Sequence, residues 1–160
     1  MLTPVRNEAT RTEATEAKSG VQARFVRAVG RHQVWMSLST SREFEVAEQR
    51  TVLPTRFLET GDVGWITYVG ATAVLRSITL IAREPEAGAA SDPVSWVRVA
   101  IAEQGSGAPI DTLERAAVTL MAESPHVTDR RALARAIGTT CARLDRHRRA
   151  ANAPGSHRTP

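Results

Sequence analysis

The chain has 160 residues, of which 42% are apolar, so it can bury one ordinary hydrophobic core rather than several. Its formal net charge is +4, and residues 140–160 hold the whole excess, because five arginines stand there against one aspartate. Residues 1–139 are neutral, with 16 basic and 16 acidic groups, which argues against a body that binds nucleic acid over its entire surface.

Composition also bears on location. The single Cys141 cannot form an internal disulfide, and the N-terminus lacks the basic flank and long apolar run of a secretion signal. No apolar run approaches the roughly 18 residues that a membrane span needs. We therefore expect a soluble cytoplasmic protein without a membrane partner, and the sequence leaves its oligomeric state open. Arginine provides 20 of the 21 basic side chains, which we attribute to the codon usage of a GC-rich bacterial genome.

The apolar pattern divides the chain into three parts. Residues 1–20 hold scattered apolar groups with no period and are predicted to form a disordered lead. Residues 21–149 are predicted to fold as a single α+β domain. Residues 150–160 again have no period and are predicted to be a disordered basic tail.

Alternating apolar and polar residues predict several strands after residue 20. The predicted strands cover residues 21–25, 34–38, 44–53, 65–69, 73–81 and 94–102. Gly30 with Arg31 is expected to form a turn, Pro54 to end the third strand, and Gly70 to separate the fourth from the fifth. These elements predict an antiparallel sheet of about five or six strands.

Two helices are predicted at the C-terminal end. Asp111 and Glu114 resemble a capping box, and Thr128 is placed to cap the second helix. Apolar stripes follow each cap with helical spacing. Their members are Leu113, Ala116, Ala117, Leu120 and Met121, then Leu133, Ile137, Cys141 and Leu144. We expect both helices to pack on one face of the sheet.

The sequence contains few signs of chemistry. It has no phosphate-binding GxxxxGKS loop, no GxGxxG opening a helix and no GxSxG elbow. Its four histidines, His32, His126, His147 and His157, lack partners at metal-ligand spacing. Cys141 lies on an apolar helix stripe, where a thiol is inert. We expect no metal and no cofactor, and no catalytic residue is identified.

Arg76 is the most informative single residue, because it interrupts an apolar strand. Regular alternation would place it on one face with Val74 and Ile78. A guanidinium there needs a partner, which could be the carboxylate of a bound ligand or an internal glutamate such as Glu45 or Glu48. At an edge of the sheet, its head would instead reach water.

Residues 42–136 resemble the chorismate pyruvate-lyase family and the related ligand-binding domains of GntR-type regulators. The matching pieces are FEVAEQR at 44–50, VLRSI at 74–78, the segment 94–102, and the helices that follow Leu113 and Thr128. The resemblance implies that Arg76, with Arg50, grips a carboxylate of the ligand. The chain departs from the family by ending in arginines rather than in strands that carry an acidic residue, and by having strands at 21–40 where the family has helices.

Binding of a small carboxylate is therefore the predicted function, and any reaction would be that of a lyase. The alternative is a nucleic-acid-associated regulator, because two short helices separated by a break have the outline of a helix-turn-helix. Its phosphate contacts would come from Arg130, Arg131, Arg135, Arg143, Arg146, Arg148 and Arg149. A protein that pairs a strand edge with a partner is a third alternative, which no residue selects.

Overall fold

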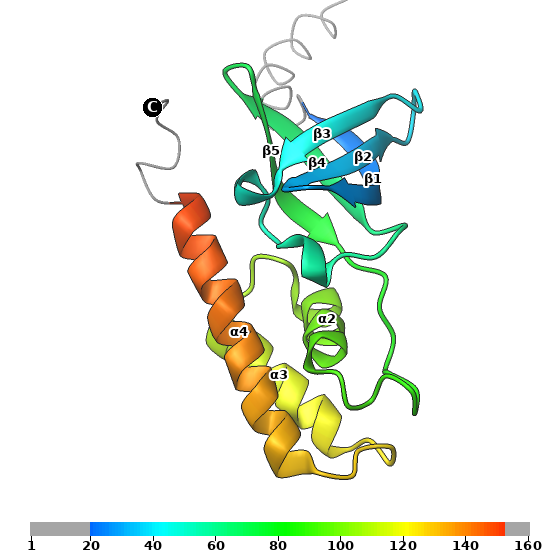
Figure 1. The fold of residues 1–160 in the computed structure, drawn as a ribbon, viewed down its shortest axis with the longest axis vertical. Helices are drawn as coiled ribbons and strands as arrows, with labels where there is room; N and C mark the ends of the chain where they lie inside the picture. Colours follow the sequence, from blue (N-terminus) through cyan, green and yellow to red (C-terminus); the bar gives the residue numbers. More distant parts are fainter. Residues whose placement is uncertain (1–19, 153–160) are drawn as a thin grey trace, which may run out of the picture.

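The computed structural model describes residues 20–152, which form a sheet followed by three long helices (Figure 1). The strands are β1 (Val21–Val29), β2 (His32–Ser37), β3 (Glu43–Ala47), β4 (Val63–Val69) and β5 (Thr72–Thr79). Two 3-10 helices, η1 (Glu48–Arg50) and η2 (Thr55–Phe57), lie between β3 and β4. The α-helices are α2 (Pro93–Gln104), α3 (Ile110–Ala122) and α4 (Arg130–Asn152).

The five strands form one sheet in the order β3-β2-β1-β4-β5, with every neighbouring pair antiparallel. The first four strands are thus a Greek key, because β4 returns to lie beside β1. The sheet curls until its two edges meet, where Thr51 forms a parallel bridge with Leu75 and the Val52 amide donates to the Leu75 carbonyl at 2.8 Å. The result is a partly open five-stranded Greek-key barrel, the arrangement seen in OB folds.

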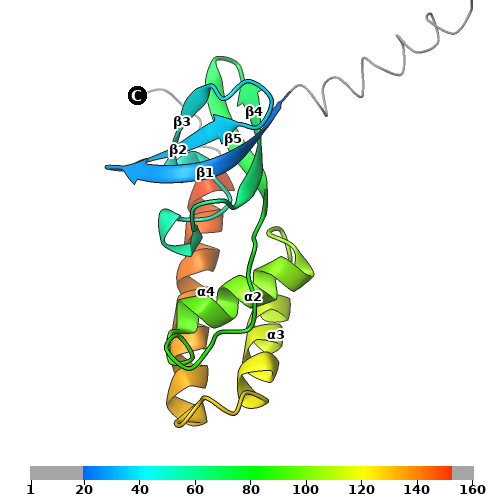
Figure 2. The same ribbon diagram turned by 90° about the vertical axis from the view of Figure 1, so that its right-hand side faces the viewer.

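The three helices pack on one another beyond one end of the barrel (Figure 2). They meet the barrel mainly through the 3-10 helices, α2 at η2 and α4 at η1. One continuous core nevertheless joins both parts, with Trp35 and Ile66 from the barrel and Trp96 and Leu144 from the helices. The α+β class and the antiparallel sheet are confirmed. The two predicted C-terminal helices are present as α3 and α4, but α2 packs with them, and the three lie beyond the end of the barrel rather than on one face of the sheet.

The prediction of a strand at 94–102 is wrong, because this segment belongs to helix α2. The Asp92 side chain caps the helix by accepting from the Val94 amide at 3.1 Å, and Pro93 occupies its first position. Residues 96–101 are all buried, so no polar face reveals a helical period. The valines and the tryptophan then favoured a strand that the Asp-Pro start signal overrides.

Several helix and strand boundaries also differ from the predicted ones. The strand predicted at 44–53 ends at Ala47, where η1 begins. The capping box is wrong, because α3 starts at Ile110 with no side-chain cap. Asp129 rather than Thr128 caps α4, accepting from the Ala132 amide at 3.0 Å. The turns at Gly30 and Gly70 are confirmed, with φ of 60° and 65°.

Helix α4 continues to Asn152, past the predicted domain boundary at 149, so residues 150–152 are helical. The other residues predicted to be disordered, 1–19 and 153–160, lie outside the described part of the chain.

Candidate anion-binding site

Arg76 is the extra residue of a β-bulge. In the β4–β5 pairing, Trp65 lies opposite Ser77 and Ile66 opposite Leu75, which leaves Arg76 without a partner on β4. A bulge reverses the alternation of faces, so the core receives Leu75 before it and Ile78 after it. Arg76 is therefore exposed, and the expectation that it shares a face with core residues is wrong.

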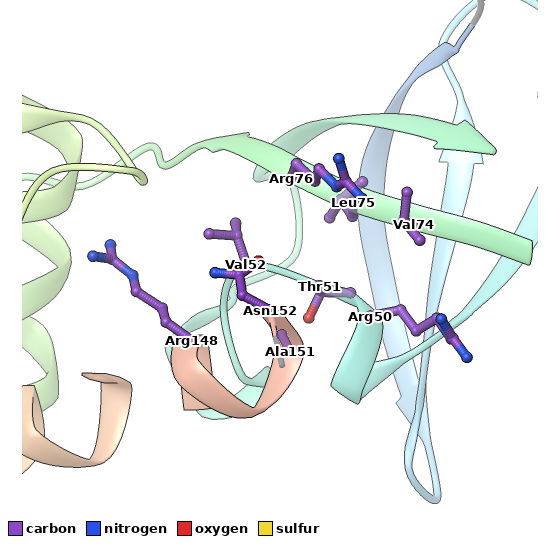
Figure 3. A pocket seen from close by; sticks show the side chains of 9 residues that line it. All are labelled: Arg50, Thr51, Val52, Val74, Leu75, Arg76, Arg148, Ala151 and Asn152. Atoms are coloured by element: carbon purple, nitrogen blue, oxygen red, sulfur yellow. The ribbon is translucent and has the colours of Figure 1, made fainter. Parts of the chain in front are cut away.

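The bulge lies beside a pocket of about 180 Å³ at the seam of the barrel (Figure 3). Three arginines from three elements line it: Arg50 at the end of η1, Arg76 on β5 and Arg148 on α4. The other lining residues are Thr51, Val52, Val74, Leu75, Ala151 and Asn152. The two residues predicted to bind a ligand, Arg50 and Arg76, are thus brought together. Arg148 was predicted only as a nucleic-acid contact.

Arg148 is half-buried and held by backbone carbonyls of the α2–α3 connection. Its Nη1 donates to the Ala108 carbonyl at 2.6 Å and its Nη2 to the Ser106 carbonyl, while its buried Nε has no hydrogen-bond partner among residues 20–152. Burial lowers the pKa of this guanidinium. The sequence contained a signal for this burial, because Arg148 lies four residues after Leu144 and continues the apolar stripe of α4.

The pocket wall is fixed by hydrogen bonds. The His147 Nε2 lies 2.8 Å from the Thr51 carbonyl oxygen, which ties the end of α4 to the segment after η1. The buried Gln33 Nε2 donates to the Thr51 hydroxyl at 3.3 Å, to the Leu53 carbonyl at 3.1 Å and to the Thr55 hydroxyl at 3.1 Å. These contacts hold Thr51 and Val52 in place without a ligand.

Electrostatics favour an anion in this pocket. Among residues 20–152, no carboxylate lines the pocket, and neither Arg76 nor Arg148 forms an ion pair. The partial negative charge at the C-terminal end of α4 disfavours a bound anion, but it amounts to only about half an elementary charge. In Figure 3 the guanidinium of Arg148 points toward the α2–α3 side, that of Arg50 points the opposite way, and Arg76 lies between. The three charges therefore surround the pocket rather than form one clamp.

The seven arginines of the nucleic-acid prediction fall into two groups. Arg130 donates to the Ala122 and Ser124 carbonyls at 3.0 and 2.9 Å, Arg148 is half-buried, and Arg149 pairs with Asp145 at 2.9 Å. The other four are exposed and have no ion pair within the described chain: Arg131, Arg135, Arg143 and Arg146. All seven lie on one helix of 23 residues, which runs antiparallel along α3 (Figure 1), rather than on the short second helix that was expected.

The sequence reasoning missed a buried ion pair between Arg98 and Asp62. These side chains are 4% and 1% exposed, and Nη1 of Arg98 lies 2.8 Å from Oδ2 of Asp62. Arg98 also donates to the Phe57 carbonyl at 2.6 Å and to the Ile81 carbonyl at 2.9 Å. The pair connects α2 to the loop before β4, so it is a structural contact. In the sequence, Arg98 stands between Val97 and Val99. The prediction of a strand places Arg98 on the opposite face from these valines and so does not predict that it is buried.

Two further groups considered for chemistry are Cys141 and His126. Cys141 is buried as expected, and burial raises the pKa of its thiol to about 11. His126 is exposed in the α3–α4 loop. In the part of the chain that the structure describes, no group of three or more His, Cys, Asp or Glu side chains is placed to hold a metal.

No family model, curated protein or solved structure matches the chain. The resemblance to the chorismate pyruvate-lyase family stays a prediction, and its segment 94–102, matched to a strand, is helical here. None of the helices among residues 20–152 is long and apolar enough to cross a membrane.

Proposed function

We propose that this protein binds the carboxylate of a small molecule in the pocket formed by Arg50, Arg76 and Arg148. The observation that carries the proposal is a pocket lined by three arginines, one of them the half-buried Arg148, and by no carboxylate of residues 20–152. A buried charge without a counterion is costly, and a bound anion offsets that cost. Guanidinium and carboxylate groups also match in geometry.

The size of the pocket limits the ligand. A cavity of about 150 Å³ holds benzene, and this pocket measures about 180 Å³. Val52, Val74 and Leu75 provide an apolar wall for the hydrocarbon part of the molecule. A carboxylic acid with one ring or a short chain therefore fits best.

Binding is favoured over catalysis by the residues that line the pocket. Apart from the arginines, its polar side chains are Thr51 and Asn152. The Thr51 hydroxyl lies 2.8 Å from the Glu48 carbonyl and 2.7 Å from the Leu53 carbonyl, so it is not free to act as a nucleophile. None of the described residues that line the pocket is a His, Asp or Glu, the usual general bases.

The test is a thermal-shift screen of the full chain against aromatic and aliphatic mono- and dicarboxylates. An acid present at about 100 times its Kd should stabilise the fold by about 2.7 kcal/mol. Arg76→Ala should remove most of this shift while the unliganded melting temperature stays the same, because Arg76 is exposed and makes no ion pair within the described chain. Arg115→Ala is the matched control, since Arg115 is exposed on α3 and does not line the pocket.

Two results would contradict the proposal. One is a screen in which no carboxylate shifts the melting temperature at low salt. The other is a shift that both arginine variants retain, which would place the ligand elsewhere. Unfolding of Arg76→Ala without ligand would instead show that this residue has a structural role.

A further inference from the structure

We propose that the exposed face of α4 is a second binding site, which holds the phosphate backbone of double-stranded nucleic acid without reading its sequence. The site is formed by Arg131, Arg135, Arg143 and Arg146, the four α4 arginines whose side chains make neither an ion pair nor a hydrogen bond in the described chain. It is separate from the pocket and does not depend on the carboxylate proposal.

The four arginines lie along one side of the helix. At about 100° per residue they fall within an arc of about 120°, while the buried residues of α4 occupy the opposite side. The first and last of them are separated by roughly 22 Å along the axis, at about 1.5 Å per residue. A backbone with about one charge per 1.7 Å of duplex axis presents many phosphates over that length.

Charge is distributed very unevenly over the described chain. Helix α4 contains seven arginines and one aspartate, a formal charge of +6. Residues 20–129 contain ten arginines and 13 acidic groups, a formal charge of −3. An ordinary solvated helix mixes both signs, whereas α4 concentrates one. The uneven distribution would orient the protein with α4 toward a polyanion.

The structure favours a duplex over a single strand. Proteins that bind single strands stack the bases on aromatic side chains, and α4 contains no aromatic residue. Barrels of this kind bind oligonucleotides on the outer face of β2 and β3. That face is poorly suited here, because Glu43 and Glu45 lie on it and Glu43 already binds Arg27 at 3.1 and 3.2 Å.

The test measures binding of the full chain to a fluorescent DNA duplex of about 20 base pairs by anisotropy, between 50 and 200 mM salt. With about four phosphate contacts, log Kobs should fall against log salt with a slope of about −3.6, a loss of about 150-fold over this range. Replacing all four arginines by glutamine should bring the slope close to zero. Glutamine has nearly the same helix propensity, so α4 should remain folded, which circular dichroism checks.

The control carries the same change of charge at other exposed arginines, namely Arg31, Arg56, Arg83 and Arg115. It should keep most of the affinity and the slope, and Arg76→Ala should keep both. Equal loss in the four-residue α4 variant and the control would overturn the proposal, since net charge alone would then explain binding. Failure to bind the duplex at 50 mM salt, or tighter binding of a single strand of equal length, would also overturn it.

Discussion

At the scale of single residues, the structure assigns very different roles to arginines that the sequence cannot tell apart. Arg98 is buried against Asp62, Arg148 is half-buried against carbonyls, and Arg76 is exposed by a bulge. Each outcome depends on partners distant in the chain, such as Asp62, which lies 36 positions from Arg98. Burial therefore decides whether an arginine stabilises the fold or is available to a ligand.

This difference predicts the stability of two variants. Arg98→Met should lower the free energy of unfolding by about 3–5 kcal/mol, because it leaves the Asp62 carboxylate buried without its countercharge. Arg27→Met breaks the exposed pair with Glu43 and should have a much smaller effect, because water screens that pair. Urea unfolding of both variants measures the two losses, and similar losses would contradict this account of the Arg98 pair.

At the scale of elements, capping residues at the start of a segment determine whether it forms a helix or a strand when its apolar periodicity fits both. Helix α2 is rich in valine and buried over residues 96–101, so its pattern alone does not separate a helix from a strand. Asp92 and Pro93 resolve it, because the aspartate satisfies a free amide and proline suits the first helical position. The bulge in β5 differs from α2, because no residue next to Arg76 in the sequence indicates the change of register.

The cap makes a prediction for α2. Asp92→Ala should cost about 1 kcal/mol of stability, since it removes the acceptor of the Val94 amide. Asp92→Ser retains a capping oxygen and should stay near the wild type. Thermal unfolding followed by circular dichroism compares the two variants, and an equal loss in both would show that the cap does not determine this helix start.

At the scale of the whole molecule, barrel and helices form one core although they look like separate layers. The core cluster contains side chains from both parts, and the Arg98–Asp62 pair and the contact of His147 with Thr51 cross the boundary. The pocket lies at this boundary, with walls from η1, β5 and α4. Its shape therefore depends on the helices and barrel remaining docked.

We expect the two parts to unfold together. In a Trp96→Phe variant the remaining tryptophans, Trp35 and Trp65, lie on barrel strands, while the far-ultraviolet circular dichroism reports mainly the helices. The urea midpoints from fluorescence and from circular dichroism should coincide, as they do for a two-state domain. Separate midpoints would show that the barrel and the helices are independent units.

Features that arise from local patterns could be predicted from the sequence alone. Alternation located four of the five strands within a few residues, glycines located the turns at Gly30 and Gly70, and apolar stripes located α3 and α4. The family resemblance implied a shared role for Arg50 and Arg76, and both line one pocket.

Other features depend on contacts between distant segments: α2 as a helix, the closure of the barrel, the bulge at Arg76, and the place of Arg148 in the pocket. The physical reason is that burial, register and ion pairing depend on residues far apart in the chain. Local periodicity indicates which side of a helix or strand is apolar, but it does not indicate which other part of the chain packs against that side.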